Sequence, residues 1–317
     1  MNRRALRSVA RHAAVRWTLA IVVVTGVAAA FVTAVRDQRQ EIVAAAARLS
    51  PAAVLLAWLL VLAGSVAAMA AWRAVFAADG GPRGWRAAAG IFFVGQLGTY
   101  IPGGGWQPML QLYMGRRAGV PASRIVTAFA LNVVVSVSAG LTLGLAAAPA
   151  VLGTRAWWLA APALVALVGI ARPQLLAGLV RRAVRRWRSG QAAVPSAGRI
   201  RRAYAGSLLS WGLHGAHLWV LAVALGAPAL RTLPLCLGGM ALSILAGSFL
   251  PLTPGGVGIR EVVLTVALVG VLSRPEIVIV IAVSRLGYMA ADAVLAGLPF
   301  LGRARPARLL HPDSART

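Results

Sequence analysis

Residues 249–261 read Phe-Leu-Pro-Leu-Thr-Pro-Gly-Gly-Val-Gly-Ile-Arg-Glu and lie where two apolar runs, 232–250 and 262–272, meet. Two prolines and three glycines cannot continue a helix there, because proline lacks an amide hydrogen and glycine has a poor helix propensity. Inside a membrane, the backbone groups that such a break frees need protein or a wet cavity around them. The stretch therefore predicts a broken helix that lines a site, and the charged pair Arg260 and Glu261 ends it.

A second break of the same kind occupies residues 100–108, which read Tyr-Ile-Pro-Gly-Gly-Gly-Trp-Gln-Pro. Both breaks have Pro-Gly-Gly next to apolar arms. The break residues are Pro102, Gly103 and Gly104 in the first and Pro254, Gly255, Gly256 and Gly258 in the second. Interrupted helices in corresponding positions are typical of transporters that are built from two related halves. We therefore predict two such halves in this chain.

The composition indicates a membrane protein of one domain. Of the 317 residues, 59% are hydrophobic and the mean hydropathy is +0.78, whereas soluble domains have roughly 45–50% apolar residues. Several apolar runs approach or exceed the roughly 18 residues that suggest a membrane helix. No polar stretch is long enough for a separate soluble domain, so we predict a single membrane domain over residues 1–317.

The net charge of +25 comes from arginine, with no lysine, and lies mostly between the apolar runs. Cytoplasmic loops of membrane proteins collect basic residues, so we attribute this charge to topology and expect no nucleic-acid partner. Cys236 is the only cysteine, and the four histidines have no metal-site spacing. The sequence also has no phosphate loop, catalytic carboxylate pair or nucleophile elbow. We expect no metal, no cofactor and no enzymatic activity.

Six apolar segments predict crossing helices: 17–35, 52–72, 127–148, 157–171, 203–227 and 277–301. The first could instead be a signal peptide, since residues 32–34 resemble a cleavage site, but its 19 residues exceed the usual core of about 7–15 residues. We therefore expect it to be retained as an anchor. Segment 87–114 predicts a re-entrant hairpin, because neither arm has the roughly 20 residues needed to cross. Segment 232–272 predicts a second hairpin, for which two full spans are the alternative.

The distribution of arginine predicts the topology. With hairpin 87–114 returning to its own side, the basic segments are all cytoplasmic: 1–16, 73–86, 115–124, 172–202 and 303–317. The poorer segments then lie outside: 36–51, 149–155, 226–231 and 273–276. The positive-inside rule rejects the alternative, in which the arginine-rich segment 172–202 would face outward. We expect an inner-membrane protein with both termini in the cytoplasm, and we consider 172–202 a candidate contact for anionic lipid.

This topology predicts an inverted repeat. Residues 1–150 hold three crossings and the hairpin 87–114, and residues 151–317 hold three crossings and the hairpin 232–272. An odd number of crossings turns the second half upside down relative to the first. Inverted repeats place the substrate site near the midplane, where the broken helices meet. The predicted fold is thus all-α, with about six transmembrane helices and two re-entrant hairpins.

Five residues are candidates for substrate binding. Arg260 and Glu261 follow the second break, and Arg285, Tyr288 and Asp292 share one face of the last span at i, i+3 and i+7. Ionisable residues inside a membrane are costly and therefore functional candidates by default. The structural alternatives are that Glu261 complements the helix dipole and that Arg285 and Asp292 pair with each other.

Two other sets of polar residues lie in the predicted helices. Ser207, Ser210, His214 and His217 give segment 203–227 a polar stripe, in which the histidines either pack by hydrogen bonding or relay protons. The first hairpin offers only neutral groups near its break: Gln96, Gln107, Gln111 and Tyr113. Since it has no acid that matches Glu261, we expect the second hairpin to do the charge-dependent work.

Two motifs resemble a known family. They are Pro102-Gly103-Gly104 followed by Gly115-Arg116-Arg117-Ala118-Gly119-Val120, and Pro254-Gly255-Gly256-Val257-Gly258-Ile259-Arg260-Glu261 with Arg285 downstream. Together they are similar to the membrane region of lysylphosphatidylglycerol synthases over roughly residues 15–300. That region is associated with flipping the modified lipid, whereas a separate soluble domain transfers the amino acid. The resemblance thus implies lipid translocation without aminoacyl-transferase activity, since the sequence ends at Thr317 with no such domain.

We therefore predict a lipid flippase or a transporter of a lipid-linked substrate in the cytoplasmic membrane. The headgroup, anionic or zwitterionic, would pass through the hairpin interface while the tails stay in lipid. The alternative is a non-transporting scaffold that partners an envelope lipid or glycan enzyme. A small-solute transporter, with a closed polar cavity, is a third possibility.

Overall fold

The computed structural model describes residues 38–76, 81–101, 105–153, 164, 195–249 and 256–301. In these ranges the regular structure is entirely helical, which confirms the predicted all-α fold. The helices are α2 (Arg39–Arg48), α3 (Pro51–Ala74), α4 (Gly84–Leu97), η1 (Gly98–Tyr100), α5 (Trp106–Arg117), α6 (Ala122–Leu152), α9 (Ala197–Ala224), α10 (Ala229–Phe249), α11 (Ile259–Leu268), α12 (Arg274–Gly297) and η4 (Leu298–Phe300). Segment 36–51, expected only to connect two spans, contains the short helix α2.

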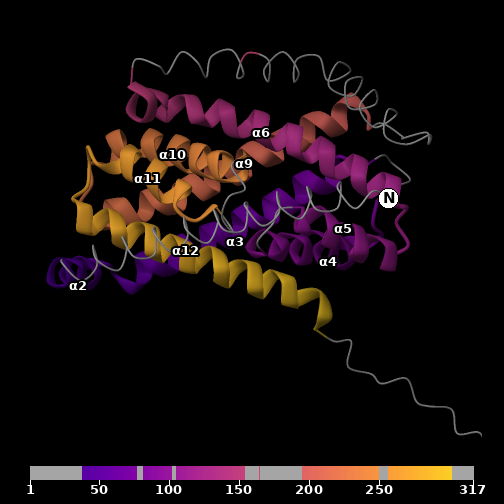
Figure 1. Cartoon of the computed structure of the whole chain (residues 1–317), viewed down its shortest axis with the longest axis horizontal. Coiled ribbons are helices and arrows are strands. Elements are labelled where there is room, and N and C mark those ends of the chain that lie inside the picture. The colour runs from indigo at the N-terminus through magenta and orange to yellow at the C-terminus, as the bar shows by residue number, and fades with distance from the viewer. Residues whose placement is uncertain are drawn as a thin grey trace, which may run out of the picture.

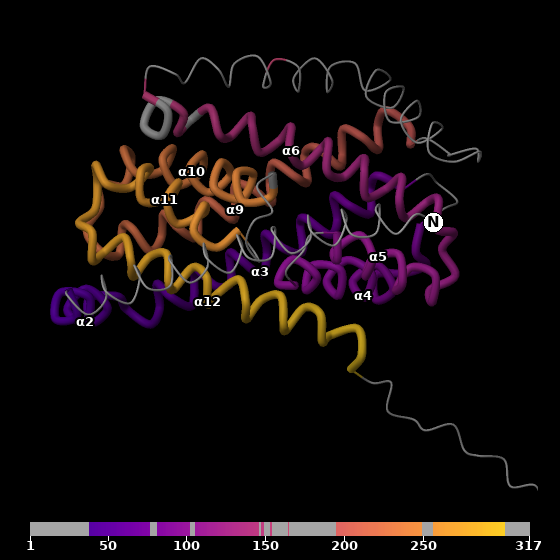
Figure 2. Tube along the Cα trace, viewed as in Figure 1, coloured from indigo at the N-terminus to yellow at the C-terminus, as the bar shows by residue number. Residues whose placement is uncertain are grey.

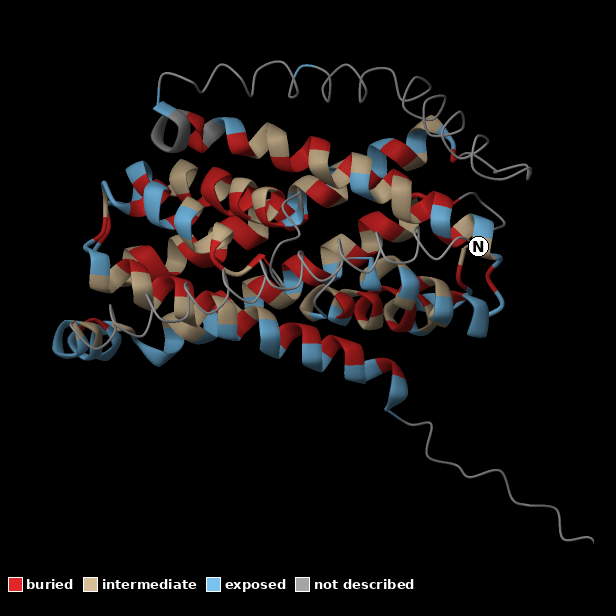
Figure 3. Cartoon of the chain, in the orientation of Figure 1, coloured by how far each residue is buried: buried red, intermediate tan, exposed pale blue. Residues whose placement is uncertain are grey.

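Five of the described helices are long and apolar enough to cross a membrane: α3, α6, α9, α10 and α12. Four of them coincide with predicted spans, and α10 is the first arm of the predicted hairpin 232–272. The predicted spans 17–35 and 157–171 lie outside the described residues, apart from residue 164. The chain is thus a multi-pass membrane protein. Figure 3 shows exposed residues along the outer sides of these helices, where lipid would surround them.

Two buried apolar clusters lie at opposite ends of the long helices. One contains α4 together with Trp72 from α3 and Leu295 from α12. The other contains α10 and α11 together with Ala57 from α3 and Ile277 from α12. Because α3 and α12 each contribute different ends to the two clusters, the α4–α5 and α10–α11 pairs pack on opposite ends of the bundle. Figures 1 and 2 show this arrangement, with α4 and α5 far from α10 and α11 along the long axis.

The helices α4 and α5 form a hairpin that is too short to cross a membrane. Their 14 and 12 residues are about 21 and 18 Å long, against a hydrocarbon core of roughly 30 Å. Val120, which follows α5, packs in the same cluster as Phe76, which precedes α4. The chain therefore leaves at the end where it entered. The helical part starts at Gly84 and ends at Arg117, slightly beyond the predicted limits 87 and 114.

The helices α10 and α11 form the second hairpin. The ten residues of α11 are about 15 Å long, against a hydrocarbon core of roughly 30 Å. Ala227 before α10 and Leu272 after α11 pack in one cluster, so this hairpin also returns to its own end. At its tip a Cβ on Gly247 would lie 3.1 Å from the Cα of Gly256, which shows how closely the arms approach.

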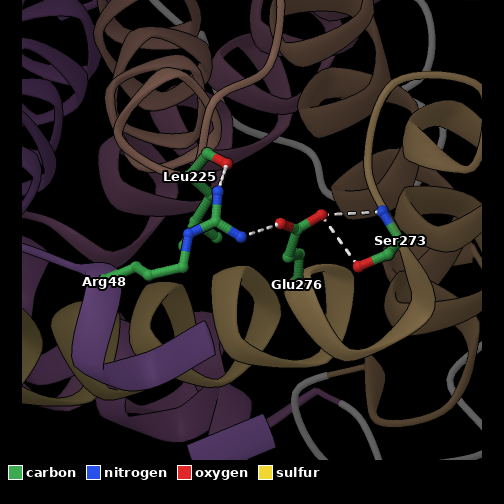
Figure 4. A network of polar contacts seen from close by, with 4 residues as sticks. All are labelled: Arg48, Leu225, Ser273 and Glu276. Carbon is green, nitrogen blue, oxygen red and sulfur yellow. Dashed lines mark hydrogen bonds and ion pairs between the residues drawn. The ribbon is translucent and has the colours of Figure 1, made fainter. Parts of the chain in front are cut away.

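Polar contacts join two segments that charge counting places outside, 36–51 and 273–276, to the end of the predicted span 203–227. Arg48, at the end of α2, donates from Nη1 to Glu276 Oε1 at 2.6 Å and from Nη2 to the carbonyl of Leu225 (Figure 4). Glu276 Oε2 accepts from both the amide and the hydroxyl of Ser273 at 2.8 Å. These contacts close the end of the bundle where α9 ends and α12 begins.

The opposite end joins segments that charge counting places in the cytoplasm. Arg199 donates to the carbonyl of Phe76 at 3.0 Å, and Arg86 donates to the carbonyl of Leu301. The predicted inner and outer segments that these contacts join thus lie at separate ends of the bundle. Which end faces the cytoplasm stays a prediction.

The motif at residues 115–120 forms the C-terminal cap of α5. The amide of Val120 donates to the carbonyl of Gly115 at 2.9 Å and that of Gly119 to Arg116 at 3.1 Å, which is a Schellman motif. Gly119 has φ +75°, where a side chain is strained. The buried Val120 then packs under the end of the hairpin. This motif therefore has a structural role in shaping the return of the chain.

We expect Gly119→Ala to destabilise the protein by about 1–2 kcal/mol, because alanine resists the left-handed conformation. The matched control is Gly212→Ala in α9, where an added Cβ meets nothing within 4 Å. Alanine there should stabilise the helix by about 0.5–1 kcal/mol. Thermal unfolding in detergent measures both variants. Equal melting temperatures for the two would contradict the assigned cap.

Candidate functional site

The middle of α12 carries the polar residues around which the site is built. Arg285, Tyr288 and Asp292 lie between Ile281, which belongs to the α10–α11 cluster, and Leu295, which belongs to the α4 cluster. The three residues are on one helical face, as their spacing predicts. This face contacts both hairpins, through α11 on one side and η1 on the other.

Glu261 forms an ion pair with Arg285. Its Oε1 accepts from Arg285 Nε at 2.5 Å and lies 2.5 Å from Nη2. Its Oε2 accepts from the amide of Gly258 at 2.6 Å, which caps the first turn of α11. Gly258 has φ +91°, so glycine suits this position. Glu261 thus has the structural role of a helix cap as well as an ionic partner.

Arg260 lies over the aromatic ring of Tyr288. The guanidinium carbon is 5.2 Å from the ring centroid, which is within cation–π range. Nε of Arg260 is buried and has no hydrogen-bond partner among the described residues. Tyr288 therefore holds the guanidinium by its ring and leaves Nε–H free to donate.

Asp292 is bonded to the first hairpin. Its Oδ2 accepts from the hydroxyl of Tyr100 at 2.7 Å, and its side chain is buried. Arg285 and Asp292 thus have different partners. The structural alternative, in which the two residues pair with each other, is not what the structure has. Tyr100 was not among the predicted site residues. The only signal in the sequence was its position at the end of the arm that leads into the first break.

The polar stripe of α9 packs against the same face of α12. The ring of Tyr288 lies 5.0 Å from that of His214 and 5.6 Å from that of His217. His217 Nε2 is 2.8 Å from Ser284 Oγ, and Ser210 Oγ donates to the carbonyl of Gly64 at 2.8 Å. For His217 these contacts agree with packing by hydrogen bonding. One ring nitrogen of each histidine, Nε2 of His214 and Nδ1 of His217, has no hydrogen-bond partner among the described residues.

The glutamines of the first hairpin act within the hairpin. Gln107 donates to the side-chain oxygen of Gln96, and Gln111 is buried against Gly95. Tyr113 accepts from Arg117 at 3.1 Å on the exposed side of α5. Of the predicted break residues, Gly256 and Gly258 are described. Pro102, Gly103, Gly104, Pro254 and Gly255 lie outside the described residues.

The ion pair borders a surface that is apolar and exposed. Glu261 and Arg285 keep about a quarter of their side chains exposed, at 25% and 23%. Their chain neighbours Val262 and Leu286 are exposed apolar residues, as is Met289 one turn further. In a membrane such residues face lipid tails. A charged group could therefore reach the ion pair while its apolar part remains in lipid.

The site has equal numbers of charges of each sign in the described part of the chain: Arg260 and Arg285 against Glu261 and Asp292. No group of three or more His, Cys, Asp or Glu residues that could hold a metal ion occurs in the described ranges. The four charged side chains have the charge types that can pair with either an anionic or a cationic group.

Comparison with known proteins supports the resemblance noted in the sequence. Residues 17–296 match the family model described as "Lysylphosphatidylglycerol synthase TM region". The match includes both hairpins and all five predicted site residues. No curated protein matches the chain.

Proposed function

We propose, since the chain belongs to the lysylphosphatidylglycerol synthase transmembrane region family, that it translocates a membrane lipid between leaflets. The family supports a lipid-related role in the membrane. The finer proposal is that an anionic or zwitterionic headgroup, or that of a lipid-linked substrate, passes between the two hairpins. We place the protein in the cytoplasmic membrane with both termini in the cytoplasm.

One observation carries this proposal: a single face of α12 is bonded to both interrupted elements. Tyr100, at the edge of the first break, donates to Asp292. Glu261, just after the second break, pairs with Arg285. A headgroup that displaces either partner would therefore loosen one hairpin from α12. Contacts that can be broken separately are what alternating access requires.

The positions of the hairpins support a path from one leaflet to the other. They pack on opposite ends of the bundle, and each returns to its own end. We propose that they are re-entrant and related as an inverted repeat. In such transporters the site is reached in turn from each face as one repeat moves against the other. The exposed apolar residues beside the ion pair would keep the acyl chains in lipid during passage.

The test is leaflet exchange of fluorescent phospholipids in proteoliposomes that contain only the purified protein. Protein-dependent exchange above that of empty liposomes supports translocation. No exchange from correctly folded protein would contradict it and favour a scaffold for an envelope enzyme. The sequence-based idea that 172–202 contacts anionic lipid falls largely outside the described residues, and it is tested by binding of the protein to phosphatidylglycerol vesicles.

We expect Tyr100→Phe to slow this exchange about threefold to tenfold, because the loss of one hydrogen bond to a carboxylate costs about 1.5 kcal/mol. It would leave the buried Asp292 without its described donor. The matched control is Tyr204→Phe, which removes another tyrosine bond between helices, 2.9 Å from Thr142. The control should exchange lipid at the wild-type rate. Equal rates for the two variants would contradict the role of α12 as the joint between the hairpins.

A further inference from the structure

Four buried polar atoms without a described hydrogen-bond partner surround Tyr288. They are its own hydroxyl oxygen, Nε of Arg260, Nε2 of His214 and Nδ1 of His217. Both histidine rings and the guanidinium pack against the Tyr288 ring, and Nε2 of His214 also lies against Gly64 of α3. Buried polar atoms are rarely left unpaired, and each such group calls for a specific explanation. Four around one ring indicate a ligand.

The chemistry of the four atoms favours an oxyanion. Arg260 Nε–H and the Tyr288 hydroxyl can both donate, and arginine has no acceptor to offer. The free histidine nitrogens become donors only when the ring is protonated. With a proton on this histidine pair, the cluster therefore presents donors for the oxygens of a phosphate group.

Charge balance links the proton to the anion. In the described part of the site, the charges of Arg260 and Arg285 are offset by those of Glu261 and Asp292. One further anion would leave the site with a net negative charge deep in the protein. Uptake of one proton by the histidine pair restores neutrality. Arg260 and both histidine rings contact the Tyr288 ring, so an anion bound by Arg260 adds a negative charge beside the histidines and favours their protonated forms.

Few other titratable groups near the histidines could accept the proton in their place. On α12 the histidines contact Tyr288, with Arg285 and Asp292 on the same helical face; Arg260 of α11 contacts the same tyrosine ring, and Glu261 follows it in sequence. Tyr100 adds a phenol from η1. The other neighbouring helices carry titratable residues only at Arg73 in α3, Arg124 in α6, and Arg231 and Cys236 in α10. The two carboxylates already have donors, Arg285 and Tyr100.

We infer that His214 and His217 bind one proton together with the anionic phosphate of the lipid, so that each lipid is carried with one proton. The proton comes from water and joins a ring nitrogen lone pair, and it leaves when the lipid is released. Proton and anion each strengthen the binding of the other, as linkage requires. This inference rests on the proposed translocation and identifies its ligand as a phospholipid with a net charge of −1 and its coupling ion as H⁺.

Binding is tested without transport by ¹⁵N NMR of histidine-labelled protein in phosphatidylcholine bicelles. His12→Gln and His311→Gln leave only His214 and His217 as labelled histidines. At pH 7.5 and saturating dihexanoylphosphatidylglycerol, we expect about one ring per protein to become imidazolium. Dihexanoylphosphatidylcholine, which has no net charge, should convert none. Two neutral rings at saturating phosphatidylglycerol probe would overturn the inference.

Coupling is tested by the steady-state leaflet ratio of fluorescent phosphatidylglycerol in proteoliposomes. One proton per lipid makes this ratio shift about tenfold for a gradient of one pH unit, since one pH unit is a tenfold ratio of proton activity. If the leaflet ratio does not change with the pH gradient and NMR shows both histidine rings neutral, the inference is overturned, whereas the proposed translocation is still supported. Ring protonation without exchange under any gradient would support the proton–anion site and count against the proposed function.

Discussion

Glu261→Gln should slow lipid exchange in proteoliposomes about tenfold or more, although the protein still folds. The amide keeps the size of the side chain and can still accept from the amide of Gly258. It removes the charge that pairs with Arg285. Breaking a fully buried ion pair costs about 3–5 kcal/mol. Because about a quarter of each side chain is exposed (25% and 23%), we expect less here, and tenfold corresponds to about 1.4 kcal/mol.

The chain supplies a close control for this variant. Glu276 is the third residue of α12, as Glu261 is of α11, and it also accepts from the backbone at the start of its helix. It also pairs with an arginine, Arg48, but at the end of the bundle. Glu276→Gln therefore removes the same kinds of contact away from the site. It should exchange lipid at the wild-type rate, and a tenfold loss there too would assign the effect to the loss of any ion pair between helices and not to the site.

A double variant separates electrostatics from packing. Arg285→Gln alone leaves Glu261 unpaired, and Glu261→Gln alone leaves Arg285 without its carboxylate. The double variant leaves neither charge, so it should be more stable than the sum of the single changes predicts. Exchange should stay slow, because the proposed site has lost both charges. Recovery of the rate in the double variant would show that the pair only holds the helices together.

Helix periodicity and the breaks were sufficient to single out the polar residues of α12 and α11, but not to say which of them pair. Arg285, Tyr288 and Asp292 fall on one face by spacing alone. Intramembrane charges also have few ways to avoid lipid except by pairing. The arginine distribution predicted which segments gather at each end, because the chain must cross an insulating layer.

The pairing of individual charges was not predictable, because it depends on rotation and depth of helices that are distant in sequence. Glu261 pairs with Arg285 and Asp292 bonds to Tyr100, while a direct Arg285–Asp292 pair had seemed equally reasonable from their spacing. The contact of Tyr288 with both histidines likewise arises only when α9 packs on α12. Long-range packing, and not local propensity, decides these partners.

The motif at 115–120 shows how a family signature can have a structural cause. It drew attention only as part of the resemblance to the family. The structure assigns its glycines and Val120 to the cap that ends α5. Such a cap returns the chain to the end of the bundle where the hairpin began, and the hairpin in turn places Tyr100 against Asp292.

We expect Trp72→Ala to have the largest effect on stability, about 3–5 kcal/mol, as is typical of aromatic side chains removed from a core. Trp72 is fully buried at the end of α3. Its ring packs edge-on against the Phe76 ring, with 4.8 Å between the ring centroids. It also packs at a tilt against the ring of Phe92 in α4, with 5.7 Å between the centroids. Lipid is itself apolar, so the loss comes from packing contacts more than from exposure of apolar surface.

The consequence of Trp72→Ala should reach the site through the first hairpin. Phe92 lies in α4, which leads directly into Tyr100, so a cavity under α4 loosens the element that bonds to Asp292. Trp85→Ala is the control, because Trp85 is exposed and contacts Arg73 only by a cation–π interaction of about 0.5–1 kcal/mol. Thermal unfolding in detergent measures the stability of both, and lipid exchange their activity. If Trp72→Ala melts with the wild type, the aromatic cluster does not anchor α4, and the first hairpin must be positioned by its contacts with α6 and α12 instead.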